Sequence, residues 1–342
     1  MDSMIAALLT QDGLTNGAIY CMLALALVLV FAVTRVIFVP QGEFVAFSAL
    51  TLAAFEQSKL PGTVWLLLAL GIAAALADAV SLWREPRRLL RAWLGTSVPT
   101  FAAAGLVWFV ASAQLPFSIQ ALTTIVAVTA MGPTVYRLAF QPIANATVLT
   151  LLIVSVAVHL VLTGLGLLFF GAEGVRTQPF TNASFTLGAV TISGQSLLVY
   201  SFTAFLVIAM AAFFKFTLFG KALRATASNR TGARLVGVSP NFAGSLSFTL
   251  AAAIGGVSGL LIGPIATIYY DSGFLIGLKG FVGAIVGGLA SYPVAAAGAI
   301  FVGLVESFSS FWASAYKEVI VFTLIIPVLL WRSLTTTHHE EE

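Results

Sequence analysis

The chain has 342 residues, of which 59% are hydrophobic and only 8% are charged. Soluble domains carry roughly a quarter charged residues, so this composition excludes a soluble protein. The apolar runs are long and continuous rather than alternating, which is typical of transmembrane helices and not of membrane-spanning strands. We therefore expect an all-α polytopic membrane protein. The formal net charge of +3 is small, and only its distribution along the chain is informative.

Eleven apolar segments follow one another, separated by turns, prolines or charged residues. They are residues 14–33, 44–55, 63–80, 98–113, 117–139, 148–170, 197–219, 242–262, 274–289, 294–311 and 319–331. Several are shorter than the roughly 20 residues that cross a bilayer upright. We expect about 10–11 transmembrane segments, one or two of them re-entrant or broken. They form a single domain of residues 1–334, followed by a disordered polar tail, residues 335–342.

A polar segment, residues 171–195, separates two of these runs. It contains TLGAVTIS, residues 186–193, in which β-branched residues flank a Gly-Ala pair. This pattern predicts a short strand or hairpin outside the bilayer.

Residues 220–240, GKALRATASNRTGARLVGVSP, form a basic segment inside the otherwise apolar chain. The segment has no acidic residue and four basic ones, Lys221, Arg224, Arg230 and Arg234. Its alanines and leucines favour a helix, which Gly232, Gly237 and Pro240 are expected to break into pieces. Positive loops between spans lie mainly on the cytoplasmic side, so we expect a cytoplasmic docking surface here.

The distribution of basic residues supports this orientation. If the basic segment is cytoplasmic, alternation of the spans places twelve basic residues inside and three outside, with Lys279 at membrane depth. The three outside are Lys59, Arg176 and Lys317. The positive-inside rule predicts this asymmetry, and the topology is N-out/C-in.

Four ionisable residues fall at membrane depth, where each would be costly alone. Glu43 stands at the start of a predicted helix, where it complements the helix dipole or contacts a solute. We expect Asp78 to pair with Arg84 near the cytoplasmic end. Lys279 and Glu306, in adjacent segments, are expected to pair with each other across the bundle.

Small residues recur at four-residue spacing toward the C-terminal end: Gly255, Gly259 and Gly263, then Gly280, Ala284 and Gly288. Such spacing lets helix backbones approach closely in lipid. An alternative interpretation is that residues 277–293 contain a broken helix that lines a transport path.

Sequence signatures of an enzyme are missing. The chain has no Walker A loop, no HExxH and no GxSxG motif, so we expect no nucleotide binding and no catalysis in this chain. A single cysteine, Cys21, and three scattered histidines predict neither a disulfide framework nor a metal cluster. Energy for any transport must come from a partner or from an ion gradient.

The basic segment contains a spaced set of residues: Gly220, Ala222, Arg224, Ala225, Ala227, Asn229, Ala233 and Gly237. Their spacing resembles the cytoplasmic loop in permease subunits of branched-chain amino acid ABC importers, and three further stretches are similar to the same family. Residues 16–25, NGAIYCMLAL, look like the family's opening helix, and Gly42-Glu43 ends a stretch similar to its Asn-Phe-Ala-His-Gly-Glu. Residues 277–281 (GLKGF) and 287–293 (GGLASYP) resemble its C-terminal pattern, with Glu306 at a later family glutamate.

The resemblance implies a membrane-spanning subunit of an ATP-driven importer in the bacterial inner membrane, working by alternating access. It implies three kinds of partner besides membrane lipid: a second permease subunit, two ATP-binding subunits and a periplasmic solute-binding protein, with no nucleic acid and no cofactor. It assigns coupling to the ATPases to Gly220, Lys221, Arg224, Ala225, Asn229, Arg230, Ala233 and Gly237, with Arg224 and Arg230 as direct contacts. It assigns the transport path to Gln41, Gly42, Glu43, Lys279, Gly287, Gly288 and Glu306.

Two departures from the family pattern leave alternatives open. The family's Asn-Phe-Ala-His is Phe-Val-Pro-Gln here, residues 38–41, so the solute is a branched-chain amino acid, a related amino acid or amide, or an aromatic or other organic acid. Residues 84–128 look like an insertion of two membrane segments before residues 136–142, YRLAFQP, which resemble the family's Glu-Arg-Leu-x-Tyr-Arg-Pro. The alternative from another class is an ion-coupled carrier without partners, with Glu306 as the titrating carboxylate.

Overall fold

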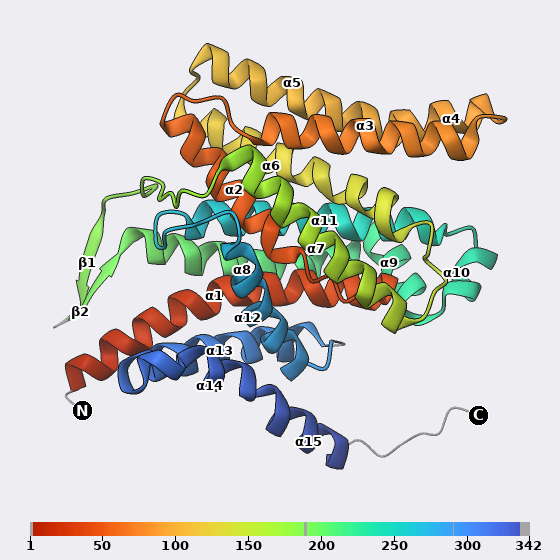
Figure 1. Cartoon of the computed structure of the whole chain (residues 1–342). Helices are drawn as coiled ribbons and strands as arrows, with labels where there is room; N and C mark the ends of the chain where they lie inside the picture. Colours follow the sequence, from red (N-terminus) through yellow and green to blue (C-terminus); the bar gives the residue numbers. More distant parts are fainter. Residues whose placement is uncertain (1–2, 188–189, 290, 336–342) are drawn as a thin grey trace. The chain divides into compact units, whose positions relative to one another are not determined.

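The computed structural model describes residues 3–187, 190–289 and 291–335, which are almost entirely helical (Figure 1). The chain divides into two compact units. Unit 1 comprises Met1–Val28, Thr181–Val207 and Leu278–Glu342, and unit 2 comprises Leu29–Phe180 and Ile208–Gly277. Three helices, α1 (Ser3–Thr34), α8 (Gly194–Phe216) and α12 (Ser272–Val286), continue from one unit into the other.

Within the described residues, eight helices are long and apolar enough to cross a membrane. They are α1, α3 (Thr63–Leu82), the continuous Pro86–Ala113, Phe117–Phe140, α7 (Val148–Phe170), α8, α11 (Pro240–Ile262) and α13 (Tyr292–Trp312). Pro86–Ala113 contains α4 (Pro86–Ala92), a π-helical turn η1 (Trp93–Ser97) and α5 (Val98–Ala113). Phe117–Phe140 contains α6 (Phe117–Val135) and a second π-helical turn, η2 (Tyr136–Phe140). The predicted all-α polytopic fold is confirmed.

The other three predicted segments are helical but short. They are α2 (Gln41–Glu56), α12, and the pair α14 (Lys317–Thr323) and α15 (Ile325–Thr335), which are separated at Leu324. A 3₁₀ turn, η3 (Ser314–Tyr316), joins α13 to α14. Residues 336–342, most of the predicted disordered tail, lie outside the described residues.

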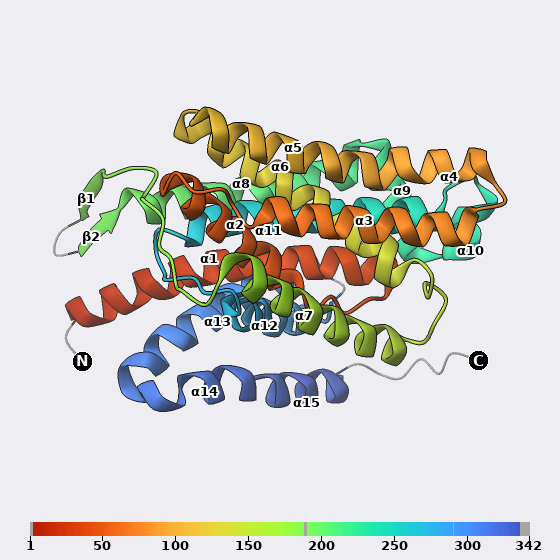
Figure 2. The ribbon, with the colours of Figure 1, turned by 45° about the horizontal axis from the view of Figure 1, so that its top comes forward.

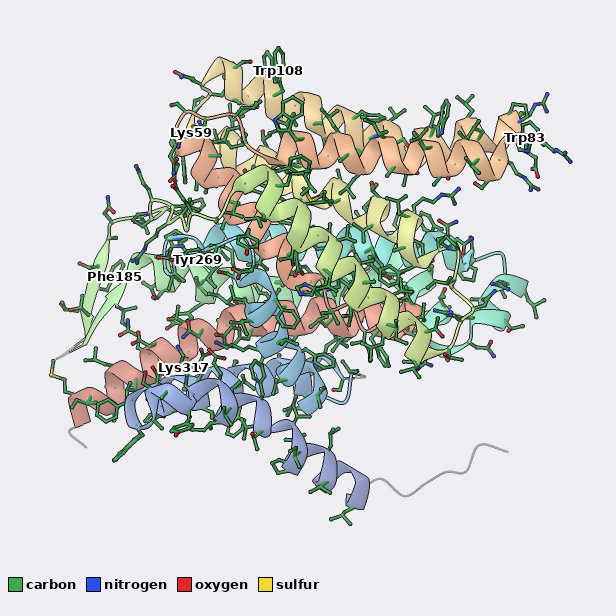
Figure 3. The ribbon with its side chains drawn as sticks, viewed as in Figure 1. Lys59, Trp83, Trp108, Phe185, Tyr269 and Lys317 are labelled. Atoms are coloured by element: carbon green, nitrogen blue, oxygen red, sulfur yellow. The ribbon has the colours of Figure 1, made fainter. Side chains whose placement is uncertain are left out.

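Helix α3 illustrates how a span of unit 2 is bounded. Its 20 residues measure about 30 Å, the thickness of a bilayer's hydrocarbon core. Lys59 precedes the helix and Trp83 follows it, so polar and interfacial residues stand at its two ends (Figure 3). Trp83 is 71% exposed, and it is followed by the basic residues of α4. Lysine and tryptophan at span ends are typical membrane-interface anchors.

The centre of unit 2 is α11, which packs on α2 and α6. Gly255 and Gly259 permit this approach, because a Cβ at Gly255 would lie 2.7 Å from the Phe44 Cβ, and one at Gly259 would collide with the Val45 carbonyl. The Ser48 hydroxyl donates a hydrogen bond of 2.6 Å to the Gly256 carbonyl across the same contact. The close packing predicted from the glycine spacing is confirmed for α11.

Residues 84–128, the predicted insertion, form α4, η1, α5 and the first part of α6. Helix α5 runs beside α3 in both views (Figures 1 and 2) and also packs on α6. The hydroxyls of Thr100 and Thr134, 2.7 Å apart, join α5 to α6. Nothing in this packing distinguishes an insertion from an original part of the fold, so the insertion stays a prediction.

In unit 1, α13 packs against α1 through glycines. A Cβ at Gly17 would lie 2.8 Å from the Ile300 Cα, and one at Gly303 would collide with Gly17. The predicted hairpin is confirmed: β1 (Ser184–Leu187) pairs antiparallel with β2 (Val190–Ser193). Helix α1 extends further toward the N-terminus than the apolar run that predicted it, since residues 3–13, which mix apolar and polar side chains, are also helical.

The break predicted within residues 277–293 is also present. Helix α12 ends at Val286, and α13 begins at Tyr292 with Pro293 in its first turn. Gly288 has φ +64° and Leu289 has φ +56°, both in the left-handed region that ends a helix. Glycine at 288 therefore serves the backbone conformation of the break, a role that the four-residue spacing did not indicate.

Candidate functional site

The basic segment folds as two short helices before α11. Helix α9 (Leu218–Ser228) is followed directly by α10 (Arg230–Leu235), with Asn229 between them in an extended conformation. The Asn229 side chain accepts a hydrogen bond of 2.8 Å from the Gly232 amide and thereby caps α10. The predicted break at Gly232 is wrong, because Gly232 lies inside α10 and the cap places the break at Asn229. Breaks after α10, at Gly237 with φ +85° and before Pro240, are as predicted.

The predicted coupling residues divide into a buried and an exposed set. Gly220 and Ala233 are buried, and a Cβ at Gly220 would collide with the Phe213 carbonyl where the chain turns from α8 into α9. The exposed residues are Lys221, Arg224, Ala225, Asn229 and Gly237. Arg224 also donates a hydrogen bond of 2.8 Å to the Phe214 carbonyl at the end of α8. The exposed set is thus available to a partner on the surface of unit 2.

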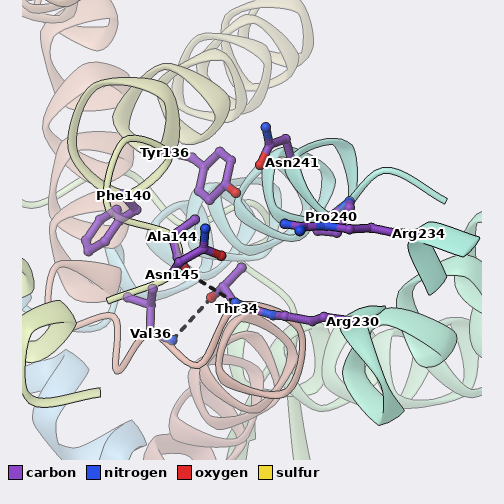
Figure 4. Close-up of a pocket in the computed structure, with 10 residues that line it drawn as sticks. All are labelled: Thr34, Val36, Tyr136, Phe140, Ala144, Asn145, Arg230, Arg234, Pro240 and Asn241. Carbon is purple, nitrogen blue, oxygen red and sulfur yellow. Dashed lines mark hydrogen bonds between the residues drawn. The ribbon is translucent and has the colours of Figure 1, made fainter. Parts of the chain in front are cut away.

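Arg230 differs from the other basic residues because its charge is used inside unit 2. Its Nη1 donates to the Ala144 carbonyl at 3.0 Å (Figure 4). Its Nη2 donates to the Val33 carbonyl, also at 3.0 Å. The side chain is only partly exposed, and burial lowers the pKa of Arg230, an effect to which Arg35 and Arg234 add by repulsion. Sequence reasoning missed these contacts because main-chain carbonyls leave no trace in the sequence.

A small cavity of about 10 Å³ lies beside Arg230 (Figure 4). Its polar lining residues are Thr34, Tyr136, Asn145, Arg230, Arg234 and Asn241. This volume accommodates about one water molecule, so the cavity is too small for a transported solute.

Glu43 lies in the first turn of α2, as predicted, and it has a partner that the sequence did not reveal. The His159 Nδ1 on α7 lies 2.5 Å from the Glu43 Oε1, and the His159 ring stacks on Phe274 with 4.4 Å between centroids. The other carboxylate oxygen of Glu43 is buried and has no hydrogen-bond partner among the described residues. The available signal was that His159 is a lone ionisable residue within an apolar run.

The two residues before Glu43 fix the start of α2 within unit 2. The Gln41 amide donates a hydrogen bond of 2.9 Å to the Ala251 carbonyl of α11. Gly42 packs directly on Gly273 at the start of α12, with no room for a side chain on either. The predicted path residues Gln41, Gly42 and Glu43 thus contact α11, α12 and α7, respectively.

Asp78 is buried and pairs with Arg137 of η2 rather than with Arg84. The Arg137 Nε and Nη2 lie 2.8 and 2.6 Å from the Asp78 Oδ1. The predicted Asp78–Arg84 pair is wrong because Arg84 lies beyond the end of α3, whereas Asp78 faces inward to η2. Proximity in the sequence favoured Arg84, whereas the packing of the helices brings Arg137, 59 residues away, to Asp78.

In unit 1 the predicted pair of Lys279 and Glu306 is confirmed, with 2.6 Å between Nζ and Oε1. Both residues are 7% exposed. Two further groups, not foreseen, complete the cluster: the Tyr20 hydroxyl donates to the Glu306 Oε2 at 2.6 Å, and the Glu318 Oε1 lies 3.1 Å from the Lys279 Nζ. Gly287 directly follows α12 and packs on Ala295, and Gly288 comes next. A lysine shared between two carboxylates keeps these charges compensated in an apolar environment.

The apolar helices and the buried charge pairs together indicate the class of protein. Apolar, span-length helices with charge pairs buried among them are typical of membrane transport proteins rather than of membrane anchors. The chain is a multi-pass membrane protein with a basic segment displayed at one surface of unit 2.

The family is shown by comparison with known proteins. The family described as the permease component of branched-chain amino acid transport systems matches residues 94–329, well over half of the chain. The chain belongs to this family, as its motifs indicated. Members are components of a transport system rather than enzymes, so this chain is a transport permease.

Curated relatives agree with this assignment. The chain is 30% identical over 213 residues to the high-affinity branched-chain amino acid transport system permease protein LivH of Escherichia coli K12, covering 60% of this chain and 69% of the relative. It is 28% identical over 216 residues to the permease protein BraD of Pseudomonas aeruginosa, covering 61% and 70% of the two chains. A probable LivH of Methanocaldococcus jannaschii is 28% identical over 226 residues, covering 63% and 70%.

Proposed function

We propose that this chain is the membrane-spanning subunit of an ATP-driven importer that moves a branched-chain amino acid into the cytoplasm. The observation that carries the proposal is the family match over residues 94–329, together with relatives whose names specify branched-chain amino acid transport. The assembly contains a second permease subunit, two ATP-binding subunits and a periplasmic solute-binding protein. It lies in the bacterial inner membrane with the N-terminus outside and the C-terminus inside.

The ATP-binding subunits dock on the exposed face of the basic segment. Helix α9 buries Gly220, Leu223 and Thr226 against unit 2 and exposes Lys221 and Arg224 on the opposite face. Leu235 and Val236, at the end of α10, are 85% and 76% exposed. Exposed apolar side chains beside positive charges favour a protein partner with an apolar groove and acidic rim.

The transport path follows the buried polar groups at membrane depth. In unit 2 these groups are Gln41 and Glu43, with Gly42 between them, and in unit 1 they are Lys279 and Glu306, with Gly287 and Gly288 on the path at the break that follows α12. Their burial and the break between α12 and α13 support this proposal, because irregular backbone at membrane depth occurs beside protein or a water-filled path.

A reconstituted complex tests the function. Proteoliposomes containing this chain with its second permease and ATPase subunits are supplied with the binding protein, radiolabelled leucine and internal or external ATP. We expect uptake only when ATP reaches the cytoplasmic face and the binding protein is present. Competition by unlabelled leucine, valine, phenylalanine and benzoate then defines the solute.

Two results would contradict the proposal. Uptake by vesicles containing this chain alone, abolished by an uncoupler, would identify an ion-coupled carrier. Competition by an aromatic acid but not by leucine or valine would retain the ATP-driven mechanism and reject the branched-chain amino acid as solute.

A further inference from the structure

The guanidinium of Arg230 joins three pieces of unit 2 that are far apart in the sequence. It starts from α10 and binds the Val33 carbonyl, 197 residues away, and the Ala144 carbonyl, 86 residues away. Val33 lies in the last turn of α1, and Ala144 lies in the loop between η2 and α7. One side chain thus connects the basic segment to the end of one membrane-spanning helix and to the loop between two others.

The chemistry of this contact is specific to arginine. The last carbonyls of a helix have no partner within the helix, so the Val33 carbonyl at the end of α1 is an open acceptor that carries part of the helix dipole. The planar guanidinium presents several donors in a fixed fork, and it reaches two acceptors that point from different elements. A lysine ammonium is a single point charge on a flexible stem and does not hold two separated carbonyls in this manner.

The neighbouring basic residues do not make such a connection. Arg234, one turn further along α10, is exposed, and its side chain makes no hydrogen bond or ion pair within the described residues. Arg224 bonds to the Phe214 carbonyl, which is ten residues away in the adjoining end of α8. Asn229 fixes the orientation of α10 by capping it, and the buried Ala233 seats the helix on unit 2. Among these residues, Arg230 alone bonds the segment both to the end of α1 and to the loop between η2 and α7.

We propose that Arg230 is a positioning residue that transmits movement of the basic segment to the end of α1 and to the loop between η2 and α7, rather than an ATPase contact. This inference rests on the proposed function, because it supposes that ATP-binding subunits move the segment. When α10 shifts, the Val33 and Ala144 carbonyls move with it as long as the fork is intact. Without the fork, the ATPases still dock and hydrolyse ATP, but the spans follow the segment poorly.

The test measures hydrolysis and uptake in the same proteoliposomes of the full complex. For Arg230→Gln we expect ATP hydrolysis and co-purification of the ATPase subunits near the wild-type level, with solute uptake per ATP lowered about tenfold, because charged hydrogen bonds to two carbonyls are lost. Arg230→Lys should give an uptake per ATP between those of the wild type and Arg230→Gln. The matched control, Arg234→Gln, removes an exposed charge from the same helix. Because Arg234 is part of the basic segment, the control is read as uptake per ATP of the assembled complex, which should stay at the wild-type value.

Two outcomes would overturn the proposal. If Arg230→Gln couples hydrolysis to uptake as the wild type does, Arg230 transmits nothing. If Arg230→Gln loses the ATPase subunits on purification while Arg234→Gln keeps them, Arg230 is itself a docking contact.

A second measurement does not depend on transport and separates this inference from the proposed function. Spin labels at the exposed positions Thr231 and Thr147 report the distance between α10 and the loop that contains Ala144. The wild-type chain should give a narrow distribution that broadens in Arg230→Gln and not in Arg234→Gln. Equal distributions in all three would refute the linkage even if ATP-driven uptake is established. A broadened distribution in a chain without ATP-driven uptake would retain the linkage and reject the function.

Discussion

At the scale of single residues, charge compensation explains how the buried ionisable side chains are accommodated. An ionised side chain in a lipid bilayer costs several kcal/mol unless an opposite charge or a hydrogen bond compensates it. Three buried carboxylates of this chain have cationic or imidazole partners: Glu43 has His159, Asp78 has Arg137, and Glu306 has Lys279. Each pair joins different helices, so the charges also determine which elements remain together.

The pair of Asp78 and Arg137 can be tested against the arginine nearer in sequence. A double-mutant cycle with Asp78→Asn and Arg137→Gln should give a coupling energy of about 1–3 kcal/mol, because the two side chains touch in a buried site. The same cycle with Arg84→Gln should give a value near zero, since Arg84 is not in contact with Asp78. The measurement is unfolding in mixed micelles by denaturant titration. Equal coupling in the two cycles would disprove the assignment.

Lys279 is the only cation that contacts Glu306 and Glu318 among the described residues. Lys279→Met should lower the free energy of unfolding by about 3–5 kcal/mol, because Glu306 is left buried without a positive charge. The matched control is Lys215→Met, at an exposed position, which should change stability little. Thermal unfolding in detergent measures both. A restoring effect of Glu306→Gln on Lys279→Met would support electrostatic compensation, and an unchanged melting temperature in Lys279→Met would contradict it.

At the scale of the elements, close helix contact depends on glycine. Apolar side chains gain little by meeting each other in lipid, so helices associate through small residues that let backbones approach. Helix α11 uses Gly255 and Gly259 against α2, and α13 uses Gly303 against Gly17 of α1. Gly288 has another purpose, since its positive φ allows α12 to end and α13 to begin.

Replacing Gly259 by alanine tests the α2–α11 contact. The added methyl would strike the Val45 carbonyl, which belongs to a backbone and does not move aside easily, so we expect a destabilisation of about 1–3 kcal/mol. Gly164→Ala in α7 is the control, because nothing lies within 4 Å of its Cβ position. Alanine there should be neutral or stabilising, since it favours the helix. Equal melting temperatures of the two variants would argue against close packing at Gly259.

At the scale of the whole molecule, the chain belongs to a family of transport components. The proposed importer therefore needs a surface on which a separate ATPase acts. The basic segment provides such a surface through the exposed side chains of Lys221 and Arg224. Arg230 differs from them because its side chain is hydrogen-bonded to two carbonyls that are distant in the sequence, those of Val33 and Ala144.

Reversing the charge of Arg224 tests docking without disturbing the fold. Arg224→Glu should lower co-purification of the ATPase subunits about tenfold, because it places a like charge opposite the proposed acidic rim. The control is Lys59→Glu, at an exposed position that precedes α3 and lies outside the basic segment, and it should leave the complex intact. Membrane insertion of both variants is checked by protease protection. Full recovery of the ATPase subunits with Arg224→Glu would reject a docking role for that residue.

The amino-acid sequence by itself determined the class of protein and the positions of its segments. A continuous apolar run that crosses a bilayer must satisfy its backbone hydrogen bonds internally, which a helix does within one segment. Glycine, proline and β-branched residues influence the helix ends, turns and strands next to them in the chain. The hairpin, the α12–α13 break and the pairing of Lys279 with Glu306 could therefore be predicted, and the motifs sufficed to indicate the family.

Only the tertiary structure decided which distant groups meet. His159 joins Glu43 from 116 residues away, Arg137 displaces Arg84 as the partner of Asp78, and Arg230 binds two main-chain carbonyls. The Asn229 cap that begins α10 is a local contact. The sequence did not reveal it because the nearby Gly232 predicted a helix break three residues later. A charged residue within an apolar segment of the sequence indicates that an opposite charge or a hydrogen bond must compensate it. The packing of the helices determines which group supplies it, because the partner is chosen by proximity in space and not along the chain.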